Sequence, residues 1–234
     1  MNEFTDDSFG LIKFGKESWL KNIKEGKIWF RTIEYYQDYE ADNNIGDKNE
    51  GVSDIFHPDE NTKFYFSHPA IEDGKTFEIS NIAGPVHSFP NYSRNTYIFC
   101  LSFFTSRDII EKTIYDDSIL TQKDWDDVFF FFNPVEFINT VRKSLDKYNP
   151  CFRKVLYFDY LKNNVNLDIF SKSEKYRYQK EVRIVFQYFG QKDRLIEQIN
   201  DDTIAITLDK NIEGVIIPTD SFREGFIVEN ARGE

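Results

Sequence analysis

Apolar and polar residues alternate in several short stretches of the chain, and this alternation predicts β-strands. The clearest stretch covers residues 176–188, YRYQKEVRIVFQY, where a charged start runs into β-branched and aromatic residues. The alternation gives one strand face with Glu181, Arg183 and Val185, and another with Val182, Ile184 and Phe186. A carboxylate in an apolar strand is costly to bury without partners. Glu181 is therefore either a site residue or half of a solvated pair with Arg183.

The same pattern predicts further strands at residues 10–14, 27–32, 63–67, 76–82, 97–106, 126–132, 152–160, 203–208, 214–217 and 225–228. One helix is predicted to include Ser18 and to end at Gly26. A second is predicted from Pro134 to near Lys147, with Asn133 as its N-cap. Residues 34–50 and 164–176 predict loops or short helices.

Many strands and few helices, without an internal repeat, predict an α+β fold built on a mostly antiparallel sheet with a few flanking helices. At 234 residues the chain fits a single domain, 1–234. Within it, residues 40–95 are rich in acids, Asn, Gly and Pro, which predicts a loop-rich excursion. The many acids of residues 34–50 are expected to stay exposed.

Composition narrows the possible functions. The net charge is −11, from 40 acidic and 29 basic residues, which argues against broad binding to nucleic acid or anionic membranes. Cys100 and Cys151 lack a CxxC spacing and are expected to be buried thiols. The three histidines have no zinc-site spacing, and a cation site in the acidic segment is disfavoured, so no metal is expected. Without a signal peptide or apolar span, a cytoplasmic location and no membrane partner are expected.

Common catalytic motifs are missing from the sequence: it contains no GxSxG elbow, no GxxxxGK[ST] loop and no GxGxxG after a strand. Paired carboxylates for glycoside hydrolysis remain possible, but 40 acids make any one pair uninformative. One ordered set of polar residues remains. It combines an early cation (Lys13 or Arg31), a hydroxyl-bearing strand (Ser102, Thr105, Ser106) and a late Gln-x-Glu (Gln179, Glu181).

In this order the residues resemble the mono-ADP-ribosyltransferase fold. Its members carry a basic or His residue on the first strand, then a Ser-Thr-Ser-like strand, then [Glu/Gln]-x-Glu. The chain also resembles uncharacterised bacterial domains, often found in mobile and phage-defence contexts, that begin with Lys/Arg-Tyr and end in a W-x-x-E-x-E-x-R strand. The matching segments here are LIKFG and YRYQKEVR, with Tyr178 in place of the Trp and Gln179 in place of an acid.

The resemblance implies a split-sheet fold and NAD as the substrate of a toxin or defence effector. Glu181 would hold the ribose 2′-hydroxyl and stabilise developing positive charge, while Gln179 would orient the acceptor. The other implied roles are pyrophosphate binding by Lys13 or Arg31, support of the glutamate by Ser102 or Thr105, and stacking by Tyr35, Tyr36 or Tyr178. The acceptor would be a protein or a nucleic acid, and an antitoxin or chaperone is a further possible partner.

Two other functions remain open. One is a non-catalytic interaction or inhibitor module that uses an aromatic and acidic surface around residues 35–50. The other is a nuclease that uses acidic residues with a divalent metal. An enzyme requires Glu181 in a concave pocket with cations and hydroxyls around it, whereas a binding module allows it to lie on an open face.

Overall fold

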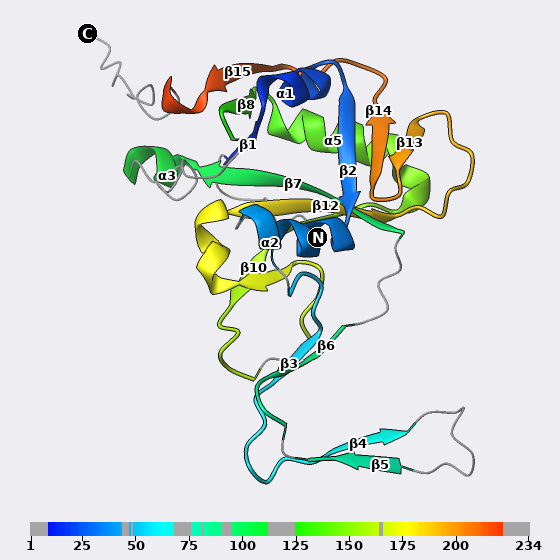
Figure 1. Cartoon of the computed structure of the whole chain (residues 1–234). Coiled ribbons are helices and arrows are strands. Elements are labelled where there is room, and N and C mark those ends of the chain that lie inside the picture. Colours follow the sequence, from blue (N-terminus) through cyan, green and yellow to red (C-terminus); the bar gives the residue numbers. More distant parts are fainter. Residues whose placement is uncertain are drawn as a thin grey trace.

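The computed structural model describes residues 9–43, 47, 49–67, 76–80, 82–89, 95–111, 125–163 and 166–221. The fold is α+β, as predicted, and is built on a nine-stranded sheet whose pairings are all antiparallel. The strand order is β13-β14-β2-β7-β1-β8-β15, and β12 lies between β7 and β9 (Figure 1). The strands are β1 (Phe9–Gly15), β2 (Lys27–Thr32), β7 (Thr96–Thr105), β8 (Asp127–Phe131), β9 (Cys151–Lys154), β12 (Glu181–Gln187), β13 (Ile196–Asn200), β14 (Thr203–Thr207) and β15 (Gly214–Pro218).

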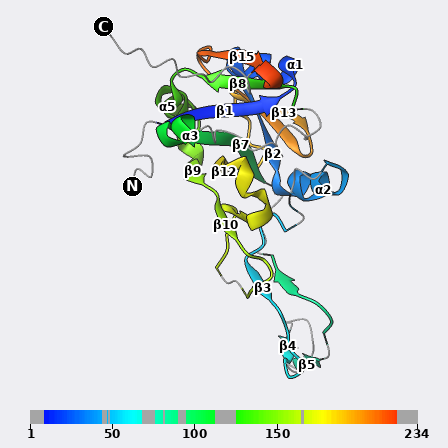
Figure 2. The same cartoon turned by 90° about the vertical axis from the view of Figure 1, so that its left-hand side faces the viewer.

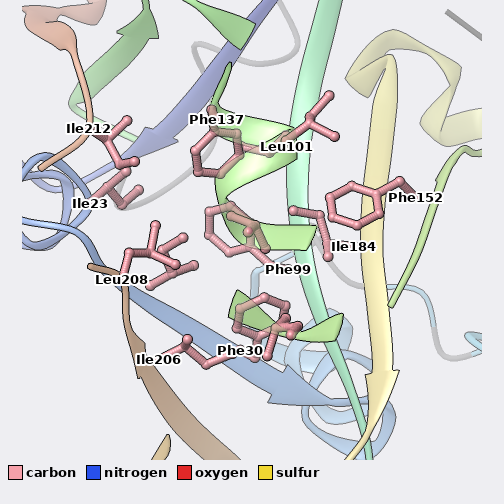
Figure 3. Close-up of a cluster of buried hydrophobic side chains, with 14 of the residues drawn as sticks. Ile23, Phe30, Phe99, Leu101, Phe137, Phe152, Ile184, Ile206, Leu208 and Ile212 are labelled. Atoms are coloured by element: carbon pink, nitrogen blue, oxygen red, sulfur yellow. The ribbon is translucent and has the colours of Figure 1, made fainter. Parts of the chain in front are cut away.

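Short helices flank the sheet: α1 (Glu17–Lys24), α2 (Ile33–Asn43), α3 (Ser106–Glu111) and α5 (Pro134–Ser144), with 3-10 helices η2 (Asp146–Tyr148) and η3 (Glu174–Gln179). The predicted cap of α5 is confirmed, because the Asn133 side chain accepts a hydrogen bond from the Glu136 backbone N–H at 3.0 Å. The main core joins the sheet to α1 and α5, and Figure 3 shows Phe30, Phe99 and Phe137 within it.

Strand β7 is the centre of the sheet, and its pairing explains where the site lies. One edge of β7 pairs with β12 continuously, from Ser102 opposite Glu181 to Thr96 opposite Gln187. The other edge is shared: β1 pairs with residues 102–105, and β2 pairs with residues 97 and 98. Within the part of the chain that the structure describes, residues 99–101 have no strand partner on that edge. The sheet therefore splits there, with β1 and β2 diverging from the same strand.

A projecting arm, defined as the described residues between 54 and 89, extends away from this sheet (Figures 1 and 2). It consists of two separate two-stranded ladders. Strand β3 (Asp54–Phe56) pairs with β6 (Val86–Ser88), and β4 (Phe64–Ser67) pairs with β5 (Thr76–Ile79). The arm lies inside the segment predicted as a loop-rich excursion.

The prediction of one strand over residues 152–160 is wrong. The chain changes partners at Val155, whose N–H bonds to the Glu181 carbonyl, while the next N–H bonds to the carbonyl of Phe170. Strand β9 thus stays in the main sheet, and β10 (Leu156–Phe158) pairs in parallel with β11 (Ser171–Ser173). Cys151 begins the edge strand β9 and is exposed, which contradicts the expectation of two buried thiols. The strand expected at residues 225–228 lies outside the described residues.

Gly26 is a position where a side chain is expected to destabilise the fold. It follows α1 with φ +79°, and a Cβ there would lie 2.5 Å from the carbonyl oxygen of Lys210. We expect Gly26→Ala to lower the free energy of unfolding by more than the roughly 1–2 kcal/mol that a left-handed backbone alone costs. Gly190→Ala is the matched control, because Gly190 has φ +76° and nothing within 4 Å of a Cβ. Denaturant unfolding measures both variants, and equal losses would contradict the clash.

Candidate functional site

A pocket of about 170 Å³ lies where β1 and β2 diverge from β7. It opens between these strands, α1, α2 and the start of β12. Seven of the residues predicted from the sequence line it: Lys13, Arg31, Tyr35, Tyr36, Ser102, Gln179 and Glu181. The split in the sheet is what brings them together, because a continuous ladder along β7 would fill this space with backbone.

Strand register places the key side chains on three neighbouring strands. Ser102 on β7 lies opposite Ile12 on one side and opposite Glu181 on the other. Lys13 follows Ile12 directly and so starts on the other strand face, at the point where the sheet splits, and Lys13, Ser102 and Glu181 all line the pocket. Thr105 does not join them. It ends β7 and donates its hydroxyl to Asp108 at 2.8 Å, at the start of α3.

Glu181 is buried at the base of the pocket, with both carboxylate oxygens bonded. Its Oε1 accepts from Arg183 Nε at 2.6 Å, and its Oε2 accepts from Lys172 Nζ at 2.9 Å. Burial alone would raise the pKa of the Glu181 carboxyl, but the charges of Arg183 and Lys172 outweigh it and hold this pKa well below its usual range. The carboxylate therefore stays ionised at neutral pH. The pairing of Glu181 with Arg183 is confirmed, but it is buried rather than solvated.

Arg183 links Glu181 to a second carboxylate that the sequence did not single out as part of the site. Its guanidinium binds both oxygens of Glu50, with Nη2 at 3.0 Å from Oε2, and also the carbonyl of Ile169. Arg183 and Glu50 are each 1% exposed, as is Asp47, which accepts from the N–H groups of Asn49 and Ser173. The expectation that the acids of residues 34–50 stay on the surface is therefore wrong for Asp47 and Glu50.

Gln179 lines the pocket, but it does not lie on the strand where it was predicted. It ends η3 and does not lie on the strand face of Glu181, because Lys180 adopts a left-handed conformation (φ +43°) before β12 begins. Lys172 on β11 joins the two side chains, with Nζ 2.8 Å from Gln179 Oε1 and 2.9 Å from Glu181 Oε2. Lys172 lies in a segment expected to be a loop or short helix, and neither its spacing nor a motif marks it.

Lys13 is the cation on the opposite wall. Its Nζ donates to the carbonyl oxygen of Cys100 at 2.8 Å, one of the β7 groups that the split leaves without a strand partner, and lies 5.2 Å from the centre of the Phe99 ring. Among the described residues Lys13 forms no ion pair. Burial lowers the pKa of the Lys13 amine, although the thiol of Cys100 and the charge of Glu181 act in the opposite direction. An anionic ligand would stabilise its charged form.

Arg31 and Tyr36 line the pocket at the α2 side. The Arg31 guanidinium lies 4.0 Å from the centre of the Tyr35 ring, and its Nη1 is 3.4 Å from Thr203 Oγ1. Burial, with a contribution from the Cys100 thiol, raises the pKa of the Tyr36 hydroxyl well above its usual value. Tyr36 is therefore a neutral hydrogen-bonding group at this wall, and Tyr35 is a ring held against a cation.

All three tryptophans of the chain, Trp19, Trp29 and Trp125, line the same pocket. Trp125 stacks on Phe14 with ring centres 5.1 Å apart and an interplanar angle of 13°. The charged lining residues are four cations, Lys13, Lys27, Arg31 and Lys172, and one acid, Glu181. In a chain of net charge −11, this combination of cations and aromatic rings favours a ligand that carries both negative charge and a flat ring.

Across the described ranges, no group of three or more His, Cys, Asp or Glu side chains could hold a metal ion. No helix in the described part of the chain is long and apolar enough to cross a membrane.

No protein-family description matches the chain, and neither a curated protein nor a solved structure is significantly similar to it.

Proposed function

We propose that this chain is a mono-ADP-ribosyltransferase-like enzyme that cleaves NAD and transfers ADP-ribose to a macromolecular acceptor. The observation that carries the proposal is the pocket at the split of the sheet, which gathers Lys13, Ser102, Gln179 and Glu181 from segments far apart in sequence. The divergence of β1 and β2 along β7 supports a split-sheet relationship to that fold.

The chemistry requires a fixed negative charge beside a ribose. Cleavage breaks the bond between the ribose C1′ and the nicotinamide nitrogen, and the electron pair leaves with nicotinamide. The ribose gains oxocarbenium character, as in glycoside cleavage. An acceptor nucleophile then bonds to C1′ and loses its proton. The ionised Glu181 carboxylate would stabilise the cationic ribose and hold its 2′-hydroxyl, which is binding that strengthens in the transition state.

The pocket suits one end of NAD. Its volume of about 170 Å³ is below the roughly 300–1,000 Å³ of pockets that enclose a whole drug-sized ligand. We therefore assign the nicotinamide and its ribose to the pocket, against the tryptophan rings and Glu181. The pyrophosphate would meet Lys13 or Arg31, whose charges lack a carboxylate partner among the described residues.

A protein acceptor fits better than a nucleic acid. Four basic residues, Lys143, Lys147, Arg153 and Lys154, were the candidates for a nucleic-acid-binding face. Lys147 is paired with Asp193 at 2.6 Å, and Arg153 with Asp168 at 2.8 Å. Two of these four charges are thus already neutralised, which reduces the positive charge left for phosphate contacts. A role as a toxin or defence effector, held in check by an antitoxin or chaperone, is part of this proposal.

A second candidate function, a non-catalytic interaction module, is favoured by the projecting arm. Four of its large apolar side chains are exposed: Phe56, Tyr65, Ile79 and Phe89. Two-stranded ladders are marginally stable alone in water. This arm, rather than residues 35–50, would then be the contact surface. Loss of partner binding after Tyr65→Ser, with an unreactive pocket, would favour this candidate.

Tryptophan fluorescence tests NAD binding, because every tryptophan of the chain lines the pocket. We expect NAD to quench the emission saturably. Lys13→Met should weaken the apparent affinity about 10- to 100-fold, the range for losing a hydrogen bond to a charged group. Lys24→Met is the control, because Lys24 is exposed at the end of α1. Quenching without saturation, or equal affinities in both variants, would contradict NAD binding at this pocket.

A further inference from the structure

Lys172 occupies a position that the sequence did not indicate. It is a lysine only 4% exposed, on the short strand β11, and its ammonium meets two pocket residues at once. Nζ lies 2.8 Å from Gln179 Oε1 and 2.9 Å from Glu181 Oε2, and 4.9 Å from the centre of the Tyr176 ring. Lysine is rarely buried unless it is paired. Here the pairing is with the two residues of the Gln-x-Glu motif.

This contact fixes the direction of the Gln179 amide. An ammonium can only donate hydrogen bonds, so the amide oxygen must face Lys172. The amide nitrogen then faces away from Lys172, and it lies 3.5 Å from the hydroxyl of Tyr178. Gln179 therefore has a defined acceptor end at Lys172 and a defined donor end that points away from Lys172.

The hydrogen bond from Lys172 also holds the Glu181 carboxylate in place. Arg183 holds Oε1 and Lys172 holds Oε2, so the carboxylate plane is defined by two cations on different strands. A carboxylate oxygen accepts up to two hydrogen bonds, so each oxygen keeps capacity for a substrate hydroxyl. Lys172 thus acts on both residues of the motif, although they lie on different elements.

We propose that Lys172 is a positioning residue that locks Gln179 and Glu181 into one hydrogen-bonded unit, with the carboxylate ionised and the Gln179 donor turned away from Lys172. The contribution of Lys172 to catalysis rests on the proposed function. It implies that Glu181 acts through its charge rather than by accepting a proton. The proton of the acceptor nucleophile must then leave to solvent or to a group of the acceptor.

The direction of the pH effect follows from the groups around Glu181. These are Lys172 on β11, Arg183 on β12 with Glu50 behind it, Lys13 on β1, Tyr36 on α2, Cys100 on β7 and Tyr157 on β10. Burial raises the pKa of Glu181, and Arg183 and Lys172 lower it further than burial raises it. A depressed folded-state pKa gives stability that is present above the unfolded pKa and lost as pH falls through the folded one. Removing Lys172 should therefore move this loss to higher pH.

Carbon-13 NMR of protein labelled at the glutamate carboxyl carbon tests the unit without any assay of activity. Glu181→Gln assigns the resonance. We expect Glu181 of the wild type to titrate well below the ordinary glutamate pKa of about 4.3, and Lys172→Met to raise that pKa. Lys175→Met is the matched control, because Lys175 is exposed and lies over the same Tyr176 ring at 4.6 Å. An ordinary Glu181 pKa in the wild type overturns the proposal, even if Lys172→Met does not fold.

Turnover of NAD supplies the second readout. We expect Lys172→Met to lower kcat about 10- to 100-fold, the cost usual for residues that orient the ligands of a metal site by hydrogen bonds, and to move the acid limb of the pH profile to higher pH. Lys172→Arg, which keeps the charge, should recover part of the rate. A turnover and profile unchanged in Lys172→Met overturn the catalytic role. If the wild type releases no nicotinamide, the proposed function fails, but the NMR titration still decides whether Lys172 holds Glu181 ionised.

Discussion

Replacing Arg183 by methionine is expected to lower the free energy of unfolding by about 3–5 kcal/mol, because removing one partner of a buried ion pair leaves the other charge uncompensated. Arg183 is 1% exposed and binds both oxygens of Glu50 and one oxygen of Glu181. Its loss leaves Glu50 without the partner of its carboxylate, and leaves Glu181 with Lys172 alone. Denaturant unfolding of the purified variant measures the loss.

Arg153→Met is the matched control for this prediction. Arg153 lies directly opposite Arg183 in the pairing of β9 with β12, but its ion pair with Asp168 is partly exposed. Exposed pairs contribute about 0–1 kcal/mol, so this variant should change little. Adding Glu50→Gln to Arg183→Met should recover part of the stability, because Lys172 and Glu181 then remain as a balanced buried pair. Equal losses for Arg183→Met and Arg153→Met would contradict the buried-charge argument.

Glu181→Gln is expected to lower NAD turnover at least about 100-fold while NAD still quenches tryptophan fluorescence. The amide keeps the shape of the side chain but removes the charge that would stabilise the cationic ribose, and loss of one such electrostatic group commonly costs about 100- to 1,000-fold in kcat. The effect should therefore fall on kcat more than on binding. Nicotinamide release and fluorescence titration, made on the same preparation, separate the two.

Glu174→Gln is the control for the loss of a glutamate charge. Glu174 begins η3, seven residues before Glu181, and pairs with the exposed Arg177. It does not line the pocket. A wild-type rate in Glu174→Gln and a lost rate in Glu181→Gln would locate the chemistry at the pocket. Equal rates in the two variants would exclude Glu181 as the catalytic group.

Local pattern was sufficient to predict much of the sheet. The alternation in residues 181–186 correctly separated the face of Arg183 and Val185 from the core face of Ile184 and Phe186. The cap at Asn133 was also predictable, because it depends on residues within one turn. Strand β13 could not be predicted, because four of its five residues are exposed and its polar side chains interrupt the alternation of apolar and polar residues.

Local sequence pattern could not predict the strand boundaries and buried charges that depend on contacts with other segments of the chain. Val155 looks like the middle of a strand, yet the chain exchanges β12 for Phe170 as its partner at that point. Glu50 lies in a segment full of acids, and its burial depends on its ion pair with Arg183, 133 residues later. Lys172 is also buried because it is paired, with Gln179 and Glu181, which follow it by seven and nine residues. Thr105 was grouped with Ser102 because they are close in sequence, but it ends the strand and bonds to Asp108 instead.

The central claim is that the pocket around Glu181 cleaves NAD, and the release of nicotinamide from NAD by the purified wild-type chain tests it most directly. The assay includes a cell lysate as a source of acceptor, with Glu181→Gln measured alongside. The account predicts release by the wild type that disappears in Glu181→Gln. An absence of release by the wild type, together with no NAD binding by calorimetry, would contradict it, and the projecting arm would then be the first surface to test for a partner.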